Sequence, residues 1–299
     1  MKFQNLLLTL AVLAISFSVS SQNKKEYLDG SLFFNQDAFL FEFEKQADMV
    51  YQSKNFLSIE DAEKQLNEVE RKKIKISKAK QHESTLTPQE VYKKLLLSTV
   101  AFGVSYDCGQ CDVKHVGASS GYVIDESGLI ATNHHVVDSY IKGRERNYSM
   151  LVKFANGKVY PVTEVVTAAK DFDLAVVRVD TGGDKLIPIP FGDDAQVGDD
   201  VFILSNPFNM LFYFTTGMVA RNILMDSYRK GDNAVPEMEV TADYAVGSSG
   251  APIVDNKGNL IGTVAVTRSI YAMPQEKKDL QMVVKGTIPV VLLKELVEF

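Results

Sequence analysis

The segment TADYAVGSSGAP at residues 241–252 is the most informative part of this chain. Gly247 and Gly250 flank two serines in a short turn, and an apolar strand with a second tight turn follows at residues 253–258. Glycine lets backbone N–H groups converge where a residue with a Cβ would clash. Two such N–H groups beside a nucleophile can stabilise the oxyanion of an acyl-transfer reaction. A Gly-Ser-Ser-Gly run is usually an ordinary loop, so its meaning depends on the rest of the chain.

Composition and charge narrow the class of protein. The chain has 299 residues, of which 45% are hydrophobic and 23% charged, as in soluble globular proteins. This length can bury one large core or two smaller ones. The 32 basic and 38 acidic residues give a net charge of −6. Because phosphate binding requires clustered positive charge, nucleic acid is not expected as a partner.

The first 21 residues are typical of a secretory signal peptide. A positive start at Lys2 precedes an apolar run over residues 6–19, and the small residues Ser20 and Ser21 follow. The run is too short for a stable membrane anchor, and no other stretch approaches 18 apolar residues. We therefore expect an exported protein, periplasmic or secreted, with no stable membrane insertion.

The only cysteines, Cys108 and Cys111, form a Cys-Gly-Gln-Cys motif. In an exported protein this spacing favours a local disulfide. The alternative is a metal site with His115, at the spacing Cys-x2-Cys-x3-His, although no fourth ligand is evident. A thioredoxin-type redox centre is disfavoured, because residues 112–116 have an extended rather than a helical pattern.

The sequence pattern of residues 22–85 predicts a helical N-terminal extension. Asn35 is positioned to cap a helix that runs through Tyr51, and Ser58 to cap a second one. Thr87, followed by proline and then a glutamate, predicts a third helix start. These signals place a domain boundary near residue 86.

From Ser98 onward the pattern changes to about a dozen short strands separated by turn residues. Such a pattern predicts an all-β barrel or sandwich over residues 86–299. An amphipathic helix with proline near its start is expected at residues 288–296.

Three segments carry side chains suited to nucleophilic catalysis. His134 and His135 end an apolar strand, residues 171–173 place two aspartates before a buried strand, and residues 247–250 offer two serines. Each pattern alone is usually structural, but together they supply a base, a carboxylate and a hydroxyl nucleophile. A zinc hydrolase is disfavoured, because the four histidines form no recognisable zinc set.

With these flanking residues, the chain resembles the trypsin-like serine proteases of the chymotrypsin fold, nearest the HtrA/Deg protease domain, over roughly residues 90–296. Thr-Asn-His-His at residues 132–135 matches the family's histidine motif, and Asp-Leu-Ala-Val-Val at 173–177 its aspartate motif. Gly-Ser-Ser-Gly-Ala-Pro at 247–252 matches the serine motif. Shorter matches occur at residues 197–201, 206–208 and 216–219. The resemblance implies a mainly β fold of two six-stranded antiparallel barrels.

The resemblance also implies the catalytic roles. It selects His135, Asp173 and Ser249 as the triad, in which the serine attacks, the histidine moves the proton and the aspartate orients the imidazole. The backbone N–H groups of Gly247 and Ser249 would form the oxyanion hole. The expected substrate is a polypeptide, and no cofactor or metal ion is expected.

Some positions depart from the family pattern. Ala251 replaces the usual second glycine of the serine motif, and Ser205 and Asn209 replace glycines around the motif at 206–208. No PDZ domain follows the protease-like region in this sequence, which argues against a peptide-activated quality-control machine of the HtrA kind.

The residues that bind substrate are harder to assign. Asp243 lies six residues before Ser249, where trypsin carries the aspartate at the base of its specificity pocket. The alternative is a solvent-facing carboxylate or an ion-pair partner. Ala265, Val266 and Thr267 are expected to offer the backbone edge that pairs with substrate, and Thr267 could narrow the pocket entrance.

Two other functions stay open. The chain could be a non-catalytic, protease-like binding domain, although all three triad side chains are present. It could also be a zymogen-like protein in which residues 22–85 cover the site or dock a partner.

Overall fold

The structure is a computed structural model that describes residues 33–111, 113–225 and 234–299. The expected signal peptide at residues 1–21 lies outside the described residues. Among the described residues, no helix combines the length and the apolarity that a membrane crossing needs.

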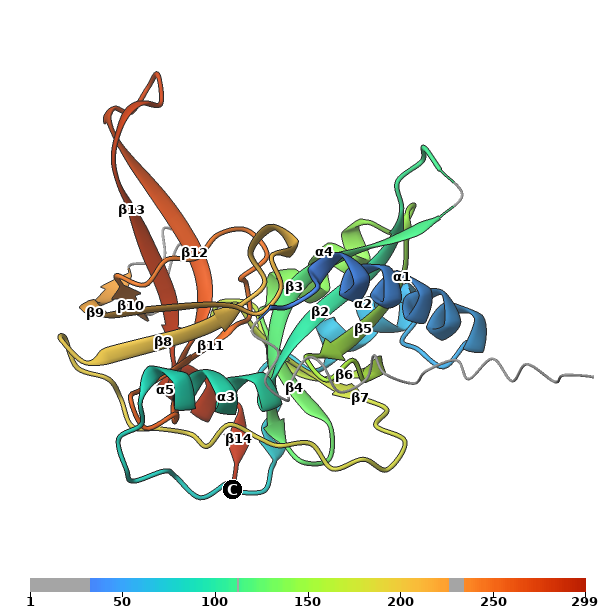
Figure 1. Cartoon of the computed structure of the whole chain (residues 1–299), viewed down its shortest axis with the longest axis horizontal. Helices are drawn as coiled ribbons and strands as arrows, with labels where there is room; N and C mark the ends of the chain where they lie inside the picture. The colour runs from blue at the N-terminus through green and yellow to red at the C-terminus, as the bar shows by residue number, and fades with distance from the viewer. Residues whose placement is uncertain (1–32, 112, 226–233) are drawn as a thin grey trace, which may run out of the picture.

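The N-terminal barrel is a closed sheet of six antiparallel strands (Figure 1). In sheet order its strands are β2 (Thr99–Asp107), β3 (Lys114–Asp125), β4 (Leu129–Thr132), β7 (Leu174–Val179), β6 (Val159–Ala169) and β5 (Asn147–Phe154). Alternate side chains such as Phe102, Ile130 and Val177 point into a fully buried core. Each such apolar side chain contributes roughly 1.5–3 kcal/mol by leaving water.

The C-terminal barrel repeats this architecture beside the first one. In sheet order its strands are β10 (Val235–Val240), β13 (Lys278–Pro289), β12 (Leu260–Met273), β11 (Pro252–Val254), β8 (Asp200–Ser205) and β9 (Tyr213–Met225). Ile203, Val219 and Ile253 are fully buried in its core. The prediction of a mainly β chain with two six-stranded barrels is confirmed. Strands β12 and β13 extend beyond the barrel as a long hairpin (Figure 1).

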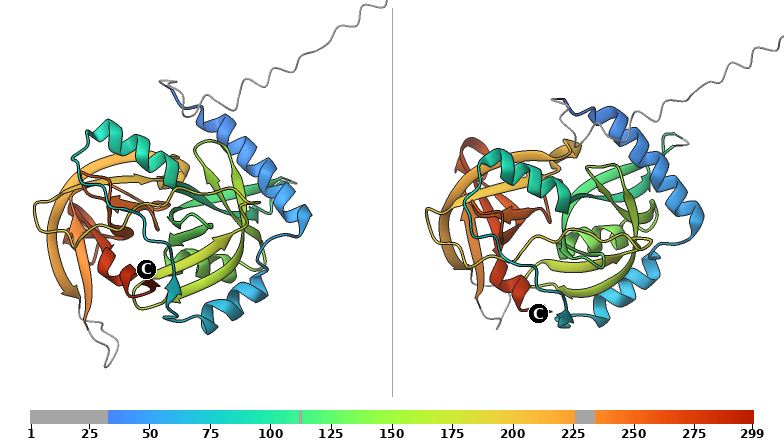
Figure 2. Two further views of the ribbon diagram at one scale, coloured as in Figure 1. Left: turned by 90° about the horizontal axis from the view of Figure 1, so that it is seen from below. Right: turned by 60° about the horizontal axis from the view of Figure 1, so that its bottom comes forward.

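Three N-terminal helices begin at the predicted caps. The helices are α1 (Gln36–Ser53), α2 (Ile59–Glu68) and α3 (Pro88–Ser98). The Asn35 side chain accepts from the Ala38 N–H at 3.1 Å, Ser58 accepts from Asp61, and Thr87 forms a complete capping box with Glu90. Figure 2 shows α1 and α2 along the outer side of the N-terminal barrel.

Helix α1 is part of the core rather than an appendage. Its residues Phe39, Phe43 and Ala47 are almost fully buried. A Cβ on Gly103 of β2 would lie 2.6 Å from the Phe43 ring, so only glycine allows the helix to approach this closely. The buried Lys153 of β5 reaches under the helix and donates to the Phe39 carbonyl at 3.0 Å.

The C-terminal helix is shorter than predicted. Helix α5 (Val290–Lys294) starts after Pro289, and the chain then forms the short strand β14 (Val297–Glu298) instead of continuing as a helix to residue 296. Strand β14 pairs in parallel with β1 (Ile74–Lys75), and the Leu296 carbonyl accepts from the Ile74 N–H at 3.0 Å. This long-range pairing, which local periodicity does not reveal, ends the helix.

Candidate active site

The histidine segment crosses from a strand to a helix that the sequence did not predict. Strand β4 leads through Asn133 into α4 (His134–Lys142). His134 is 7% exposed, and burial lowers the pKa of its imidazole. The next side chain, His135, is exposed. Of the two histidines, His135 is therefore the one that a substrate could reach.

Asp173 is held in place by hydrogen bonds that its backbone carbonyl and its side-chain carboxylate accept. Its backbone has φ 54°, an uncommon conformation for a residue other than glycine. The carbonyl accepts from His134 N at 3.1 Å and from Asn133 Nδ2 at 3.0 Å. The carboxylate accepts from His135 N at 3.0 Å and lies 2.7 Å from His135 Nδ1. This arrangement orients the imidazole with Nε2 directed away from the carboxylate. Asp171 instead forms an ion pair with Arg71.

The two serines of the glycine-flanked turn have different environments. Ser248 is fully buried, and its hydroxyl accepts from the Ala245 N–H at 3.3 Å. Ser249 is partly exposed, and its carbonyl accepts from the Ser120 N–H at 2.9 Å. Within the described chain, no hydrogen bond joins the Ser249 hydroxyl to His135. Among the described residues, His135 is therefore joined to Asp173 but not to the Ser249 hydroxyl. Contacts of this kind often tighten only when substrate binds.

Both glycines of this turn are required by geometry. Gly247 has φ 95°, and a Cβ there would lie 2.5 Å from the Asn206 carbonyl. Gly250 has φ 82°, and its Cβ would lie 2.3 Å from Thr132 Oγ1 and 2.4 Å from the Ser120 carbonyl. Over the described ranges, neither the Gly247 N–H nor the Ser249 N–H donates to a protein acceptor. Two unpaired donors beside a serine are what an oxyanion hole needs.

A buried asparagine that the sequence analysis noted only as part of a motif supports this turn. Asn206 is fully buried, and its Nδ2 donates to the carbonyls of Val100 at 3.1 Å and Ser119 at 3.0 Å. Its Oδ1 accepts from the Phe212 N–H at 3.0 Å. Its own N–H donates to Ser120 Oγ at 3.1 Å, and that hydroxyl donates to the Gly247 carbonyl at 3.0 Å. The sequence feature that could have indicated this role is that Asn206 is a polar residue directly after an apolar strand.

One of the two departures around Asn206, that at Asn209, fits the local backbone. Asn209 stands where the family has glycine and adopts φ 60°, a conformation that asparagine tolerates better than most residues. Its side chain accepts from the Ala118 N–H at 3.0 Å. The following residues reach α1, because the Leu211 N–H donates to Gln36 Oε1 at 3.0 Å. The N-terminal extension therefore contacts a loop that also contacts the serine turn.

Asp243 is far more exposed than a residue at the base of a pocket. Its side chain is 87% exposed, and it lies 3.3 Å from the Lys285 ammonium group. This is the solvent-facing ion pair that the sequence left as the alternative interpretation.

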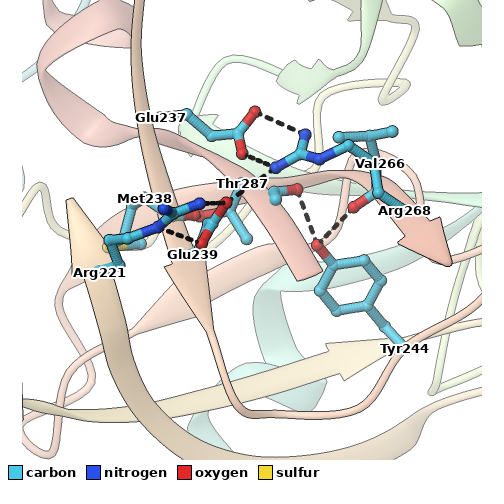
Figure 3. Close-up of polar contacts among 9 residues, drawn as sticks. Arg221, Glu237, Met238, Glu239, Tyr244, Val266, Arg268 and Thr287 are labelled. Atoms are coloured by element: carbon cyan, nitrogen blue, oxygen red, sulfur yellow. Dashed lines mark hydrogen bonds and ion pairs between the residues drawn. The ribbon is translucent and has the colours of Figure 1, made fainter. Parts of the chain in front are cut away.

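The predicted substrate edge lies on β12 next to a small cavity. Strand β12 is bulged at Ala265, and the Val266 carbonyl accepts from the Tyr244 hydroxyl at 3.0 Å (Figure 3). Thr267 is exposed one residue further on. A cavity of about 280 Å³ is lined by Ala265 and Val266 together with Asp173 and Glu237. The predicted substrate edge and Asp173 thus border the same cavity.

An ion-pair network that the sequence analysis missed lies next to this edge, on β12, β10 and β9. Arg268 contacts Glu237 and also lies 2.9 Å from Glu239, which in turn receives two 2.7 Å bonds from Arg221 (Figure 3). The hydrogen bonds from Arg221 lower the pKa of the largely buried Glu239. The four side chains come from three different strands, so periodicity within one strand gives no sign of them.

The cysteines are free in the structure. Their sulfur atoms lie 3.3 Å apart, well beyond the length of a disulfide bond of about 2.05 Å, so the predicted disulfide is not formed here. His115 Nε2 lies 3.2 Å from Cys111 Sγ. Over the described residues, these three side chains are the one group that could hold a metal ion.

Comparison with known proteins agrees with the double-barrel fold. Residues 119–262 match the family described as "Trypsin-like peptidase domain". The chain therefore carries a trypsin-like peptidase domain, and over this region it is a distant relative of the HtrA/Deg serine proteases.

Three relatives show how far the sequences have diverged. Protease Do-like 1, chloroplastic, of Arabidopsis thaliana is 34% identical over 193 residues, covering 62% of this chain and 40% of the relative. Protease Do-like 5, chloroplastic, of the same plant is 30% identical over 156 residues, or 50% of this chain and 48% of the relative. Serine protease HTRA3 of Homo sapiens is 28% identical over 206 residues, or 64% and 41%. The chain thus spans less than half the length of these relatives.

Proposed function

We propose that this protein is a serine endopeptidase that cleaves polypeptides through an acyl-enzyme intermediate. One observation carries the proposal: the Asp173 carboxylate holds His135 through both its backbone and its ring nitrogen, at 3.0 and 2.7 Å. A histidine held in this way is oriented to act as a general base. The partly exposed Ser249, between two geometrically required glycines, supplies the nucleophile.

The proposed reaction assigns one role to each group. Ser249 Oγ attacks the scissile carbonyl carbon, and its proton passes to His135 Nε2. The N–H groups of Gly247 and Ser249 stabilise the resulting oxyanion, and one such donor is worth roughly 10²–10³ in kcat. The imidazolium gives its proton to the leaving amine, which leaves an acyl ester on Ser249. Water, activated by His135, then hydrolyses the ester.

Substrate would bind as an added strand along β12. Val264 of this strand exchanges hydrogen bonds with the serine turn, since its carbonyl accepts from Gly250 N at 3.0 Å and its N–H donates to Ala251 O at 2.9 Å. Residues 265–267 continue the strand past the turn, so an extended peptide pairing there would pass beside Ser249. The cavity bordered by Val266 and Asp173 would take side chains on the amino-terminal side of the scissile bond.

Labelling by a fluorophosphonate probe tests the assignment. Wild type should be labelled and Ser249→Ala should not, whereas Ser248→Ala, which removes the neighbouring buried hydroxyl, should keep the label. If Ser249→Ala still reacts, the nucleophile is misassigned. A folded wild type that neither reacts with the probe nor cleaves a peptide library would favour the non-catalytic binding domain instead.

We also propose that the protein is exported. The basic start and the apolar run at residues 6–19 support this. Cell fractionation with N-terminal sequencing should find a mature chain that begins at Ser21 or Gln22. A cytoplasmic protein that retains Met1 would contradict the proposal.

A further inference from the structure

Three side chains with metal-binding atoms meet at the tip of the β2–β3 hairpin, outside the catalytic constellation. Cys108 directly follows β2, Cys111 lies in the turn after it, and His115 is the second residue of β3. Cys111 Sγ lies 3.3 Å from Cys108 Sγ and 3.2 Å from His115 Nε2. All three atoms are within 4.8 Å of one another. None of the three contacts the triad or the proposed substrate edge.

These separations are close to those of a tetrahedral metal site. Zinc binds cysteine sulfur at about 2.3 Å and histidine nitrogen at about 2.0–2.1 Å, which puts neighbouring ligand atoms roughly 3.5–3.8 Å apart in a tetrahedron. The two pairs that include Cys111, at 3.3 and 3.2 Å, need to open by only a few tenths of an ångström. A disulfide would require the sulfurs to close by more than twice as much, to about 2.05 Å.

The surroundings of the three ligands also fit a metal ion. Glu44 of α1 holds His115 from its other side, with Oε1 2.9 Å from Nδ1. A carboxylate on the second ring nitrogen fixes the tautomer that leaves Nε2 free to coordinate. The Gln110 N–H donates to Cys108 Sγ at 3.4 Å, which favours negative charge on that sulfur. Gly109, at φ 71°, provides the turn that brings the cysteines together.

We propose that Cys108, Cys111 and His115 bind one zinc ion, with water as the fourth ligand and Glu44 orienting the histidine. Among the abundant divalent cations, Zn²⁺ is the one that prefers a donor set of two thiolates and an imidazole. The ion would tie the hairpin tip to α1 through the His115–Glu44 contact. This inference does not depend on the proposed proteolysis, because it shares no residue with the triad.

Zinc titration of the mature full-length protein tests the proposal. The protein is reduced, its two thiols are counted with a thiol reagent, and Zn²⁺ is added against a chromophoric chelator of known affinity. We expect one zinc per chain. Cys111→Ser and His115→Ala should each weaken binding at least 100-fold, and Glu44→Gln should weaken it about 10–100-fold, as for other partners of ligating histidines.

The matched control lies one turn along the same helix. Asp48 of α1 pairs with Lys114 at 3.0 Å but contacts none of the three ligands, so Asp48→Asn should bind zinc like wild type. Circular dichroism of each variant separates lost ligation from lost folding. Two free thiols with no stoichiometric zinc would overturn the proposal, as would unchanged affinity in folded Cys111→Ser and His115→Ala. Ser249→Ala should bind zinc normally, which keeps this test separate from that of proteolysis.

Discussion

Replacing the buried Lys153 by methionine should change how the stability of the protein depends on pH. Lys153 is 1% exposed beneath α1, where its ammonium group donates to the Phe39 carbonyl and lies 4.1 Å from the centre of the Phe39 ring. Burial lowers the pKa of Lys153 from about 10.5 to about 8. The folded protein therefore releases this proton at a lower pH than the unfolded chain does.

The sign and size of this change in stability with pH follow from proton linkage. Below pH 8 both states carry the charge, and the folded state bears the full cost of holding it out of water, about 3 kcal/mol at about 1.36 kcal/mol per pKa unit. Between pH 8 and 10.5 the unfolded chain binds more protons than the folded one, so stability rises with pH. The gain from pH 7 to pH 10 should be about 2.5 kcal/mol.

The assay is urea unfolding of wild type and Lys153→Met at pH 7, 8.5 and 10. Other titrating groups are common to both proteins and cancel in the difference, while the lost hydrogen bond to Phe39 adds an offset that is nearly independent of pH. Wild type should gain about 2.5 kcal/mol relative to the variant as pH rises. Lys170→Met, at an exposed lysine, is the control and should follow wild type. A difference between wild type and Lys153→Met that stays constant from pH 7 to 10 would refute the reasoning.

Three further predictions concern the active site. Asp173→Asn should lower kcat about 10⁴-fold with little change in unfolding midpoint, because the amide favours the wrong imidazole tautomer; a loss below tenfold in steady-state peptide cleavage would count against the triad. Gly250→Ala should lower both stability and activity, because its Cβ meets Thr132 Oγ1 at 2.3 Å, whereas Gly198→Ala, at φ 95° with nothing within 4 Å, should cost only about 1 kcal/mol of backbone strain and no activity. Asn206→Ala should cost several kcal/mol in thermal unfolding, since it leaves buried partners unsatisfied at roughly 1–3 kcal/mol each, and should slow probe labelling of Ser249; unchanged labelling kinetics would show that Asn206 does not position the turn.

The strands and the helix caps could be predicted because their signals are local, whereas the arrangement of the strands in two barrels was implied by the family resemblance. Caps such as Asn35 and Ser58 satisfy backbone groups three residues away, and strand alternation has a period of two. The motifs at residues 132–135, 173–177 and 247–252 were likewise contiguous, so the resemblance could select one residue of each pair. The exposure of His135 beside the buried His134 agrees with that selection, as does that of Ser249 beside Ser248.

What the sequence could not reveal depends on contacts between distant residues. The Arg221–Glu239–Arg268 network joins three strands, and Asn206 bonds to carbonyls more than 80 residues away. Strand β14 ends the last helix because it pairs with β1 from the other end of the described chain. Asp243 matched a family spacing, but its exposure depends on the path of a loop that spacing does not determine.

These distant contacts also bear on the role of the N-terminal extension. The Phe43 ring fills the space above Gly103, β1 pairs with the C-terminal strand, and Gln36 bonds to the loop that follows Asn206. Removing residues 33–85 would therefore open the N-terminal barrel to water and unpair β14, besides freeing any surface that the extension covers. A loss of activity in such a truncation would not distinguish regulation from unfolding. Only a point change such as Gln36→Ala, which keeps α1 in place and removes one contact to the loop, can tell whether the extension acts on the serine turn.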